Sequence, residues 1–469
     1  MMDSTDLCFL PATDAARLIR DKQLSPVELM QAVLGRIEKL EPELNAFATL
    51  AADAAMDGAK AADAAVSAGG TLGPLHGVPV TIKDLAAAEG LPLERGSHIE
   101  KGRIADFDTP FVARLKDAGA IPLGKTTTSE FGWKGVSQSP LTGITHNPWK
   151  RGFNAGASSA GAGAGAAAGY GPLHQGSDGA GSIRMPSHFC GVFGIKPSYG
   201  RVPNGPISNN DQTSHNGPMT RTVADSALML KVMAGPAPLD HYSLEAPPAD
   251  YPALLSGGMK GLRVAYSPDL GHARVDPEIA DLVKNAAAAF ETLGADVEEV
   301  TPAWGPDGPD LIRFFWAAHE LAYVKFLDEW RAKMDPGLVA CIRSAENHSV
   351  QTYLEYRQRK LDYVRAIHHW FEDWDLLLTP AASVAAFPAG RLQPEHWPEH
   401  PWDWVSWAEF SYPFNMSHNP AASIPCGFTT DGLPVGLQVV GRRLDDLGVL
   451  RAAAAFEAAR PWADKRPLV

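Results

Sequence analysis

The sequence predicts an α/β fold in which a central mixed β-sheet is covered by α-helices on both faces. Two observations predict it. Short apolar runs typical of strands alternate with segments whose apolar residues recur at helical spacing. A stretch rich in glycine, alanine and serine, residues 156–203, leads directly into apolar residues typical of a core. With 469 residues, 45% of them hydrophobic, the chain can bury a large core, and we expect one domain over residues 1–469.

The first half of the chain supplies the clearest alternation. Ser25, Pro26 and Glu28 form the pattern of a helix start, with a capping serine and proline at the first helical position. Strands and helices are then expected to alternate up to residue 123. The expected segments are two helices within 13–40, strands at 46–50, 78–82 and 121–123, and helices at 53–67 and 109–119.

The second half continues the pattern with a long helical insertion. Thr222 and Asp225 predict a capped helix that ends at Gly235. The remaining expected segments are a strand at 262–266, a helix at 277–293, helices through most of 310–375, a surface loop or lid at 387–405, a strand at 433–441 and a helix at 446–459. We therefore expect a core formed by residues of about 70–235 and 410–460, and a mostly helical substrate-side region at about 300–410.

Composition and charge exclude several classes of function. The net charge of −13 and the lack of a basic stripe argue against a nucleic-acid partner. The four cysteines have no metal-type spacing and indicate free thiols in a reducing compartment. Neither a leader peptide nor an apolar run of 18 residues is found, so we expect no membrane association and a cytoplasmic location.

Several motifs have only superficial matches. Residues 119–126 fit the phosphate-loop pattern, but the expected strand lies inside the supposed loop. Residues 161–166 touch the dinucleotide pattern but lack a preceding strand, so a closely packed small-residue helix is the better interpretation. The histidines show no metal-binding spacing, and the chain has no GxSxG nucleophile elbow.

Two serine sites and one lysine remain as candidates for chemistry. Ser158 and Ser182 are both surrounded by very small residues, which leaves space for a substrate carbonyl and for backbone donors. Lys83 follows an apolar strand, residues 78–82, that is expected to enter the core. A lysine at the end of a strand is more often a surface residue, but a buried neutral lysine can act as a base.

The motifs in combination resemble those of the amidase signature family over most of the chain. The resemblance is carried by GVPVTIKD at 77–84, GSDGAGSIRMP at 176–186, FCGVFGIKPSYGR at 189–201, and the runs NPAASIPCG at 419–427 and GLPVGLQ at 432–438. The resemblance implies the fold of that family and an amidase that needs no metal or organic cofactor. Many family members are homodimers, so a homodimer is one expectation here.

The resemblance also implies a role for each candidate residue. Ser182 corresponds to the nucleophile, Ser158 to a bridging serine on a cis peptide, and Lys83 to the base. The backbone N–H groups of the loop correspond to the oxyanion hole, and three further residues are expected to hold the loop. The oxyanion-hole residues are Gly179, Ala180, Gly181 and Ser182, and the supporting residues are Ser159, Asp178 and Arg184. Three alanines, Ala157, Ala160 and Ala180, depart from the family's glycines, and the methyl group of Ala180 is expected to narrow the site or shift the loop.

Substrate choice is the least determined part of the sequence. By resemblance, Gly132 and Trp133 belong to the substrate pocket, and the aromatic residues between about 300 and 415, Trp404 among them, line the pocket or belong to the core. The pocket alternative gives a hypothesis of hydrophobic or aryl amides, extending to carbamates (urethanes) and esters. Two alternatives remain open: the amidase subunit of a glutamyl-tRNA amidotransferase, and a non-catalytic scaffold with the same fold.

Overall fold

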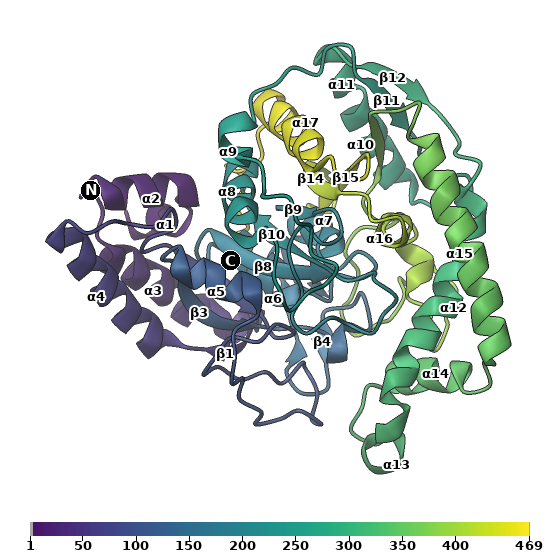
Figure 1. The fold of residues 1–469 in the computed structure, drawn as a ribbon, viewed down its shortest axis with the longest axis horizontal. Helices are drawn as coiled ribbons and strands as arrows, with labels where there is room; N and C mark the ends of the chain where they lie inside the picture. The colour runs from purple at the N-terminus through teal and green to yellow at the C-terminus, as the bar shows by residue number, and fades with distance from the viewer. Residues whose placement is uncertain (1–2, 469) are drawn as a thin grey trace.

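A computed structural model describes residues 3–468. Its largest feature is an 11-stranded sheet with the strand order β1-β3-β2-β8-β10-β9-β14-β15-β13-β11-β12 (Figure 1). The strands of this sheet are β1 (Phe47–Leu50), β2 (Pro79–Lys83), β3 (Ile121–Thr126), β8 (Leu173–Asp178), β9 (Phe193–Lys196), β10 (His215–Thr220), β11 (Arg263–Tyr266), β12 (Asp296–Glu299), β13 (Leu376–Pro380), β14 (Ala421–Phe428) and β15 (Pro434–Gly441). Two small hairpins pair β4 (Gln138–Ser139) with β5 (Gly143–Ile144) and β6 (His146–Asn147) with β7 (Lys150–Asn154).

The large sheet is mixed, as the sequence predicts. Strand β2 runs parallel to β3 and to β8, and β11 runs parallel to β12 and to β13. The pairs in the middle of the sheet, from β8–β10 to β15–β13, are antiparallel, as is β1–β3 at one edge. The parallel group that contains β2 and β8 brings the carboxyl ends of these strands to the same edge of the sheet.

The helices form most of the remaining regular structure. In the N-terminal half they are α1 (Ser4–Cys8), α2 (Ala12–Arg20), α3 (Pro26–Leu44), α4 (Ala52–Ala68), α5 (Pro110–Asp117), α6 (Ala160–Ala168), α7 (Arg184–Cys190) and α8 (Val223–Met233). In the C-terminal half they are α9 (Tyr251–Leu254), α10 (Pro277–Ala287), α11 (Ala289–Thr292), α12 (Gly308–Glu320), α13 (Leu327–Trp330), α14 (Pro336–Ala345), α15 (Val350–Trp370), α16 (Tyr412–Met416) and α17 (Asp446–Ala459). Short 3₁₀ turns are η1 (Glu130–Gly132), η2 (Gly305–Asp307), η3 (Leu321–Phe326) and η4 (Val405–Trp407).

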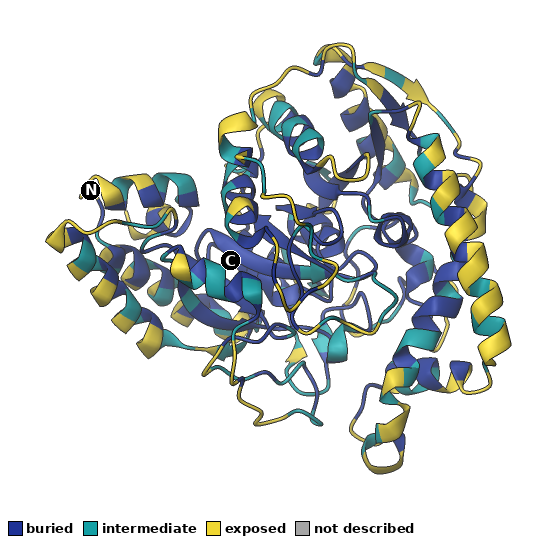
Figure 2. Cartoon of the chain, viewed as in Figure 1, coloured by how far each residue is buried: buried dark blue, intermediate teal, exposed yellow. Residues whose placement is uncertain are grey.

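Helices cover both faces of the sheet. The side chains that alternate along the strands show this, because they pack into two different hydrophobic clusters. In β15, Leu437 and Val439 belong to one hydrophobic cluster, whereas Val440 belongs to another. Because successive strand residues point to opposite faces, the two clusters lie on opposite sides of the sheet. The first cluster includes α8, α10 and α17, and the second includes α7, α12 and the aromatic residues of the helical region. Burial follows the same arrangement, with dark blue strands inside and a yellow outer surface on α15 (Figure 2).

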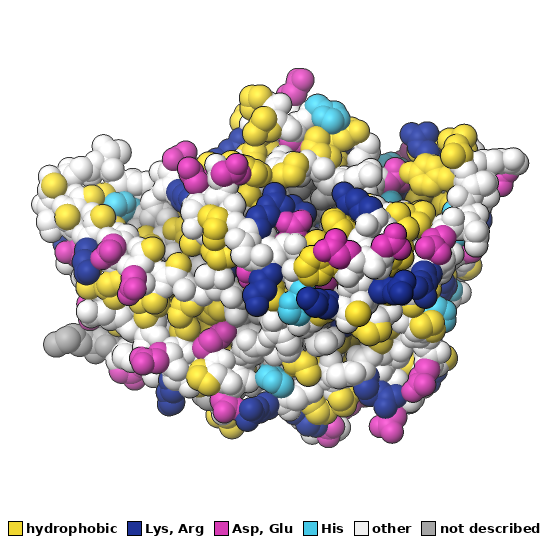
Figure 3. Space-filling view, turned by 90° about the horizontal axis from the view of Figure 1, so that it is seen from below, with side chains coloured by type: hydrophobic (Ala, Val, Ile, Leu, Met, Phe, Trp, Pro, Cys, Tyr) yellow, Lys and Arg dark blue, Asp and Glu magenta, His cyan; other side chains and the backbone are white. Residues whose placement is uncertain are grey.

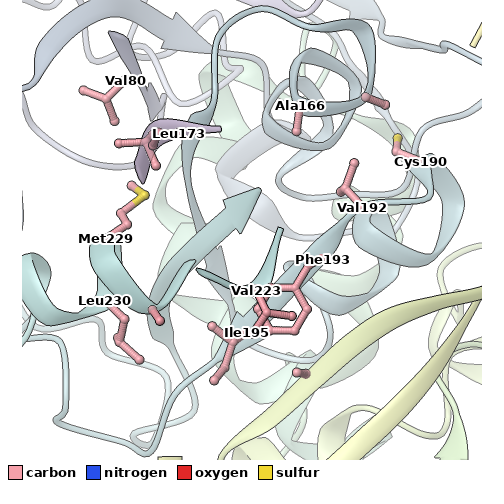
Figure 4. Close-up of a cluster of buried hydrophobic side chains, with 14 of the residues drawn as sticks. Val80, Ala166, Leu173, Cys190, Val192, Phe193, Ile195, Val223, Met229 and Leu230 are labelled. Carbon is pink, nitrogen blue, oxygen red and sulfur yellow. The ribbon is translucent and has the colours of Figure 1, made fainter. Parts of the chain in front are cut away.

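The first cluster joins segments that are distant in sequence. Figure 4 shows Val80 of β2 and Leu173 of β8 beside Met229 of α8, and Ile195 and Phe193 of β9 beside Val223. All six side chains are at most 1% exposed. The packing of this cluster fixes the positions of β2 and β8, whose ends carry the candidate lysine and serine motifs.

The predicted helix boundaries are largely reproduced, with one difference. Ser25 Oγ accepts a hydrogen bond from the Val27 N–H at 3.1 Å, and Thr222 Oγ1 accepts one from Asp225 at 3.2 Å, so both predicted caps are present. The single helix expected at 277–293 is instead two helices, α10 and α11, that are separated at Ala288. No side chain in the structure explains this break.

Four further features of the described residues concern membrane helices, metal-binding clusters, cysteines and surface charge. Across residues 3–468, no helix is long and apolar enough to cross a membrane. The same part of the chain contains no group of three or more His, Cys, Asp or Glu residues that could hold a metal ion. The four cysteines are unpaired, and three of them are buried. Acidic and basic side chains are interspersed on the face seen in Figure 3.

Candidate active site

The glycine- and serine-rich stretch builds the site at the carboxyl edge of β2 and β8. It forms α6, whose nine residues are all glycine or alanine and are all buried. This helix requires small residues, because a Cβ at Gly161 would lie 1.9 Å from the Ala46 carbonyl oxygen. The chain then enters β8, turns through residues 179–183 and begins α7. Lys83, the last residue of β2, therefore lies beside Ser177 near the end of β8.

Lys83 is the centre of the hydrogen-bonding network of the site. It is fully buried, and its Nζ donates to Ser158 Oγ at 2.7 Å and to Ser177 Oγ at 2.9 Å. Burial lowers the pKa of the Lys83 ammonium to about 7, while the negative charge of Asp178 acts in the opposite direction. A substantial fraction of Lys83 is therefore neutral near pH 7. The peptide bond between Ala157 and Ser158 is cis.

Ser182 lies on the wall of the same cavity as Lys83 and Ser158. The cavity has a volume of about 440 Å³ and is lined by all three residues. Ser182 also accepts, through its carbonyl oxygen, a hydrogen bond from the Ser159 N–H at 3.3 Å, which ties the two serine segments together. The structure thus brings together the three residues that the sequence singled out for catalysis, and this arrangement can carry a proton from a serine hydroxyl to a lysine amine.

The backbone donors of the loop differ in one respect from the expectation. The Gly181 N–H donates to Asp178 Oδ1 at 2.7 Å, so it is occupied and is not free to bind an oxyanion. Among the described residues, the N–H groups of Gly179, Ala180 and Ser182 have no hydrogen-bond partner. The methyl group of Ala180 packs in the second hydrophobic cluster and does not line the cavity, so it does not narrow the site as expected.

Asp178 and Arg184 fix the conformation of the loop at residues 179–183 through hydrogen bonds. Asp178 accepts from the N–H groups of Gly181 and Ile183 and from two nitrogens of Arg184, at 2.9 Å and 2.8 Å. Burial alone would raise the pKa of Asp178, but the Arg184 guanidinium and these hydrogen bonds hold it well below its usual value. Asp178 is therefore ionised, and its charge is paired within the loop.

Ser159 and two C-terminal residues complete this support. Ser159 Oγ donates to the Ser177 carbonyl at 3.1 Å and accepts from the Ser177 N–H at 3.2 Å. Asn415 donates to Asp178 Oδ1 at 2.9 Å, and Gln438 accepts from Arg184 at 2.8 Å. Neither Asn415 nor Gln438 was expected as a supporting residue, although Gln438 ends one of the family-like runs.

Two groups of residues form much of the cavity lining, and they are called here the aromatic side and the polar side. The aromatic and aliphatic side is formed by Leu85, Leu93, Phe107, Phe111, Phe131, Trp316, Tyr323 and Phe326. The polar side comes from the loop between β9 and β10 and from the start of β10. Its lining residues are Asn204, Ser208, Asn209, Asn210 and Ser214 of the loop and Asn216 of β10. Gly132 lines the cavity as predicted, and a Cβ there would lie 3.2 Å from Ser158 Oγ.

The expectation that Trp133 and Trp404 contact substrate is not met by the structure. Both are almost completely buried in the second hydrophobic cluster and neither lines the cavity. Trp404 Nε1 instead donates to the Trp133 carbonyl at 2.8 Å, and the two bulky indoles fill the space behind the wall. The segment expected as a lid, 387–405, does not line the cavity either. Of the tryptophans between 300 and 415, only Trp316 does so.

Several other residues that line the cavity were not predicted from the sequence. Ser177 was overlooked although it lies inside the GSDGAGS motif, where its closeness to both candidate serines was a usable signal. Glu320 and Tyr323 lie in a segment recognised only as helical. The polar loop at 204–216 gave no signal, because its composition is typical of any surface turn.

Comparison with known proteins adds an independent observation. Residues 28–450 match the family model described as Amidase. The chain is 41% identical to an acylamidase of Rhodococcus erythropolis, with 99% of this chain and 98% of that protein covered. It is 34% identical to a glutamyl-tRNA(Gln) amidotransferase subunit of Moorella thermoacetica, over 98% and 99% of the two chains. The structure of a bacterial aryl acylamidase of the amidase signature family superposes with a TM-score of 0.89 at 31% identity, covering 97% of each chain.

Proposed function

The chain belongs to the amidase signature family and is an amide-hydrolysing enzyme, and from this premise we propose that it cleaves hydrophobic or aryl amides through a Ser182–Ser158–Lys83 triad and an acyl-enzyme. One observation carries the proposal. A fully buried lysine lies 2.7 Å from Ser158 Oγ, inside the cavity that also contains Ser182. Burial lowers the pKa of this lysine to about 7, so a substantial neutral fraction can act as a base near pH 7.

The first step forms the acyl-enzyme precursor. Ser182 Oγ attacks the carbonyl carbon of the amide while its proton passes to Ser158 Oγ. Ser158 in turn gives its own proton to neutral Lys83 Nζ. The product is a tetrahedral intermediate with a negative oxygen, and Lys83 now carries the positive charge. Ser177 Oγ, at 2.9 Å from Nζ, is available to stabilise that charge.

The developing oxyanion requires donors that are not already used. The N–H groups of Gly179, Ala180 and Ser182 meet this condition among the described residues, and they replace the set of four expected from the sequence. Removal of one such donor commonly reduces the rate by about 10²–10³. Asp178 and Arg184 act indirectly, because their hydrogen bonds fix the loop that carries these donors.

The second half of the reaction reverses the proton path. The intermediate collapses with cleavage of the C–N bond, and the leaving nitrogen takes the proton from Lys83 through Ser158. Water then attacks the acyl-enzyme and gives a proton to Lys83 by the same route, forming a second tetrahedral intermediate. When this intermediate collapses, the C–O bond to Ser182 breaks, Ser182 Oγ takes the proton back from Lys83 through Ser158, and the carboxylic acid is released. Each group returns to its starting protonation state, so no cofactor is required.

The cavity walls support the proposed substrate class. Aromatic and aliphatic residues form one side of the cavity, which favours acyl or amine portions of hydrophobic or aryl type. The acylamidase and aryl acylamidase relatives agree with this choice. The same chemistry extends to carbamates and to esters, because an alkoxide is an easier leaving group than an amide nitrogen.

Labelling with a fluorophosphonate tests the triad directly. We expect the probe to react with wild-type protein and to be found, after peptide mass mapping, on the peptide that contains Ser182. Labelling should be lost in Ser182→Ala and strongly reduced in Lys83→Met. Labelling of another serine, or unchanged labelling of Ser182→Ala, would reject Ser182 as the nucleophile.

A matched control separates loss of chemistry from loss of fold. Ser187→Ala changes a buried serine of α7 that bonds to the Ile183 carbonyl and does not line the cavity. This variant should label like the wild type. All variants should be compared by circular dichroism, so that reduced labelling with an intact spectrum is assigned to the site.

A second candidate function follows from the similarity to amidotransferase subunits. At 34% identity over nearly the full length, a role as the amidase subunit of a glutamyl-tRNA amidotransferase is compatible with the fold. The higher identity to an acylamidase favours the independent enzyme. Hydrolysis of acetanilide by the purified chain without a partner subunit supports the first function, whereas glutamine hydrolysis only after addition of partner subunits supports the second. The intact triad weighs against a non-catalytic scaffold.

A further inference from the structure

An acidic residue of the active-site cavity has no role in the proposed reaction. Glu320 is the last residue of α12, one helical turn after Trp316, and Tyr323 follows in η3. Residues spaced by three or four positions share a face of a helix, and all three line the cavity. Phe131, from the same aromatic side of the cavity, stacks on Tyr323, with ring centroids 4.3 Å apart. Glu320 therefore lies within the aromatic side of the cavity.

Glu320 is buried but unpaired. The residue is 7% exposed, and its Oε2 has no hydrogen-bond partner among the described residues. The neighbouring His319 also lines the cavity, and its Nε2 likewise lacks a partner in the described part of the chain. A buried polar atom without a partner costs about 1–3 kcal/mol, so an unpartnered carboxyl oxygen at the wall of a substrate cavity is a candidate for a hydrogen bond to a ligand.

The surroundings favour a neutral ligand group over a charged one. Burial, and secondarily the negative charge of Glu130, raise the pKa of Glu320 to about 8. Burial lowers the pKa of His319 to about 4, while the charge of Asp211 raises it and the charge of Lys360 lowers it. Near pH 7 both side chains are therefore mainly uncharged. Glu320 then offers an O–H donor, and Nε2 of His319 is a donor or an acceptor, depending on the tautomer. Arg95, Lys325 and Glu100 also line the cavity, so its other charged lining residues are of both signs.

We propose that Glu320 forms a polar subsite within the aromatic side of the cavity and binds a neutral hydrogen-bonding group of the substrate, such as a hydroxyl. The preferred substrates are then amides whose hydrophobic or aryl portion carries such a group, rather than purely apolar amides. This inference rests on the proposed function, because it assigns part of the same cavity to substrate. It makes Glu320 a specificity-determining residue.

Binding to an inactive background tests the subsite without requiring turnover. The parent is Ser182→Ala, and the probes are acetanilide derivatives that carry either a hydroxyl or a methyl group at the meta or para position. Kd is measured by calorimetry for the parent and for its combinations with Glu320→Gln and Glu320→Leu. Glutamine keeps the size and hydrogen bonding of Glu320, and leucine keeps only the approximate volume.

We expect at least one hydroxylated probe to bind the parent about tenfold or more tightly than its methyl counterpart, since the loss of a buried hydrogen bond costs at least that much. The preference should persist with Glu320→Gln and disappear with Glu320→Leu. The exposed Glu329→Gln, on neighbouring α13 and outside the cavity, is the matched control and should leave the preference unchanged.

Two results would overturn the subsite: no preference for any hydroxylated probe in the parent, or the same preference in the Glu320→Leu combination. Failure of the proposed function has a different signature, because wild-type protein would then not hydrolyse the anilides although the binding pattern remained. Thermal unfolding distinguishes loss of the subsite from misfolding, and Glu320→Leu should unfold at the same or a higher temperature than the parent.

Discussion

At the scale of single residues, the burial of Lys83 determines the pH at which the proposed mechanism operates. The pKa of Lys83 is lowered to about 7 by burial, and only the neutral amine can accept a proton. We therefore expect kcat/KM for an anilide to be low at pH 5, to rise with pH through about 7, and to level off above it. A profile that is flat between pH 5 and pH 9 would show that Lys83 is not the titrating base.

The same residue gives a prediction of magnitude. Lys83→Met removes the base while keeping an unbranched side chain in the buried position, so kcat/KM should fall by about 10³, within the range typical of general-base loss. Steady-state kinetics on acetanilide measures the effect. Activity within about tenfold of wild type, in a variant with an unchanged circular dichroism spectrum, would contradict the assignment.

Two glycines of the same loop differ in what a methyl group would meet. Gly181 has φ of +116°, and a Cβ there would lie 2.5 Å from Ser411 Oγ. Gly179 has no such conformation, and its nearest neighbour would be Ser214 Oγ at 3.6 Å. Gly181→Ala should therefore lower the free energy of unfolding by about 2 kcal/mol or more, whereas Gly179→Ala should change it by less than about 1 kcal/mol. Urea unfolding of both variants measures the difference, and equal losses would refute the argument.

The residues proposed for catalysis and for support of the loop could be singled out from the sequence where they lie in a local motif. Lys83, Ser158, Ser182, Asp178 and Arg184 all belong to short runs whose order is specific. In the structure the first three line one cavity, and Arg184 bonds to Asp178 in the adjoining loop, while the roles proposed for them stay predictions. Trp133 and Trp404 were not predictable in the same way. An aromatic residue in a helical or irregular segment has the same sequence signal whether it fills the core or faces a cavity, and here both are in the core.

At the scale of elements, helices with explicit end signals were predicted best. Ser25 and Thr222 both cap the helices that their patterns indicate. Irregular segments were predicted poorly, because their conformation depends on distant partners. The segment 204–216 contributes to the cavity lining and is held by distant parts of the chain, among them α15, more than 130 positions later: Lys360 Nζ bonds to the carbonyl oxygen and the carboxylate of Asp211, at 3.0 Å and 2.5 Å.

This attachment gives a prediction for the loop. Lys360→Met removes the ion pair and the hydrogen bond to the Asp211 carbonyl, while the catalytic residues come from other elements. We expect KM to rise about fivefold, which corresponds to about 1 kcal/mol of binding, with a smaller change in kcat. Arg359→Met is the matched control, because Arg359 bonds to Asp310 and not to the loop. An equal rise of KM in both variants, or an exclusive fall of kcat in Lys360→Met, would reject the explanation.

At the scale of the whole molecule, the order of the strands was beyond prediction from the sequence. A mixed sheet follows from the alternation of segments, but the central antiparallel group joins β8, β10, β9, β14 and β15, and β9 is about 220 positions from β14. These pairings depend on long-range contacts such as the one from Lys196 Nζ to the Asn419 carbonyl. The sheet separates two hydrophobic clusters, and the second of these supports the aromatic wall of the cavity from behind.

The two layers of that wall can be distinguished by a matched pair of tryptophans. Trp316 Nε1 and Trp404 Nε1 both donate to the carbonyl oxygen of Trp133, at 2.9 Å and 2.8 Å, but only Trp316 also lines the cavity. Trp316→Phe and Trp404→Phe each remove one of these hydrogen bonds, so each should lower the free energy of unfolding by about 1 kcal/mol or more.

Only Trp316→Phe reshapes the surface that a substrate touches. The ratio of kcat/KM for an anilide to that for an alkyl amide should therefore change by about tenfold in Trp316→Phe and stay at the wild-type value in Trp404→Phe. A changed ratio in Trp404→Phe, with no change in Trp316→Phe, would indicate that Trp404 contacts the substrate. It would reject the assignment of Trp316 to a layer that contacts the substrate and of Trp404 to a layer that only supports it.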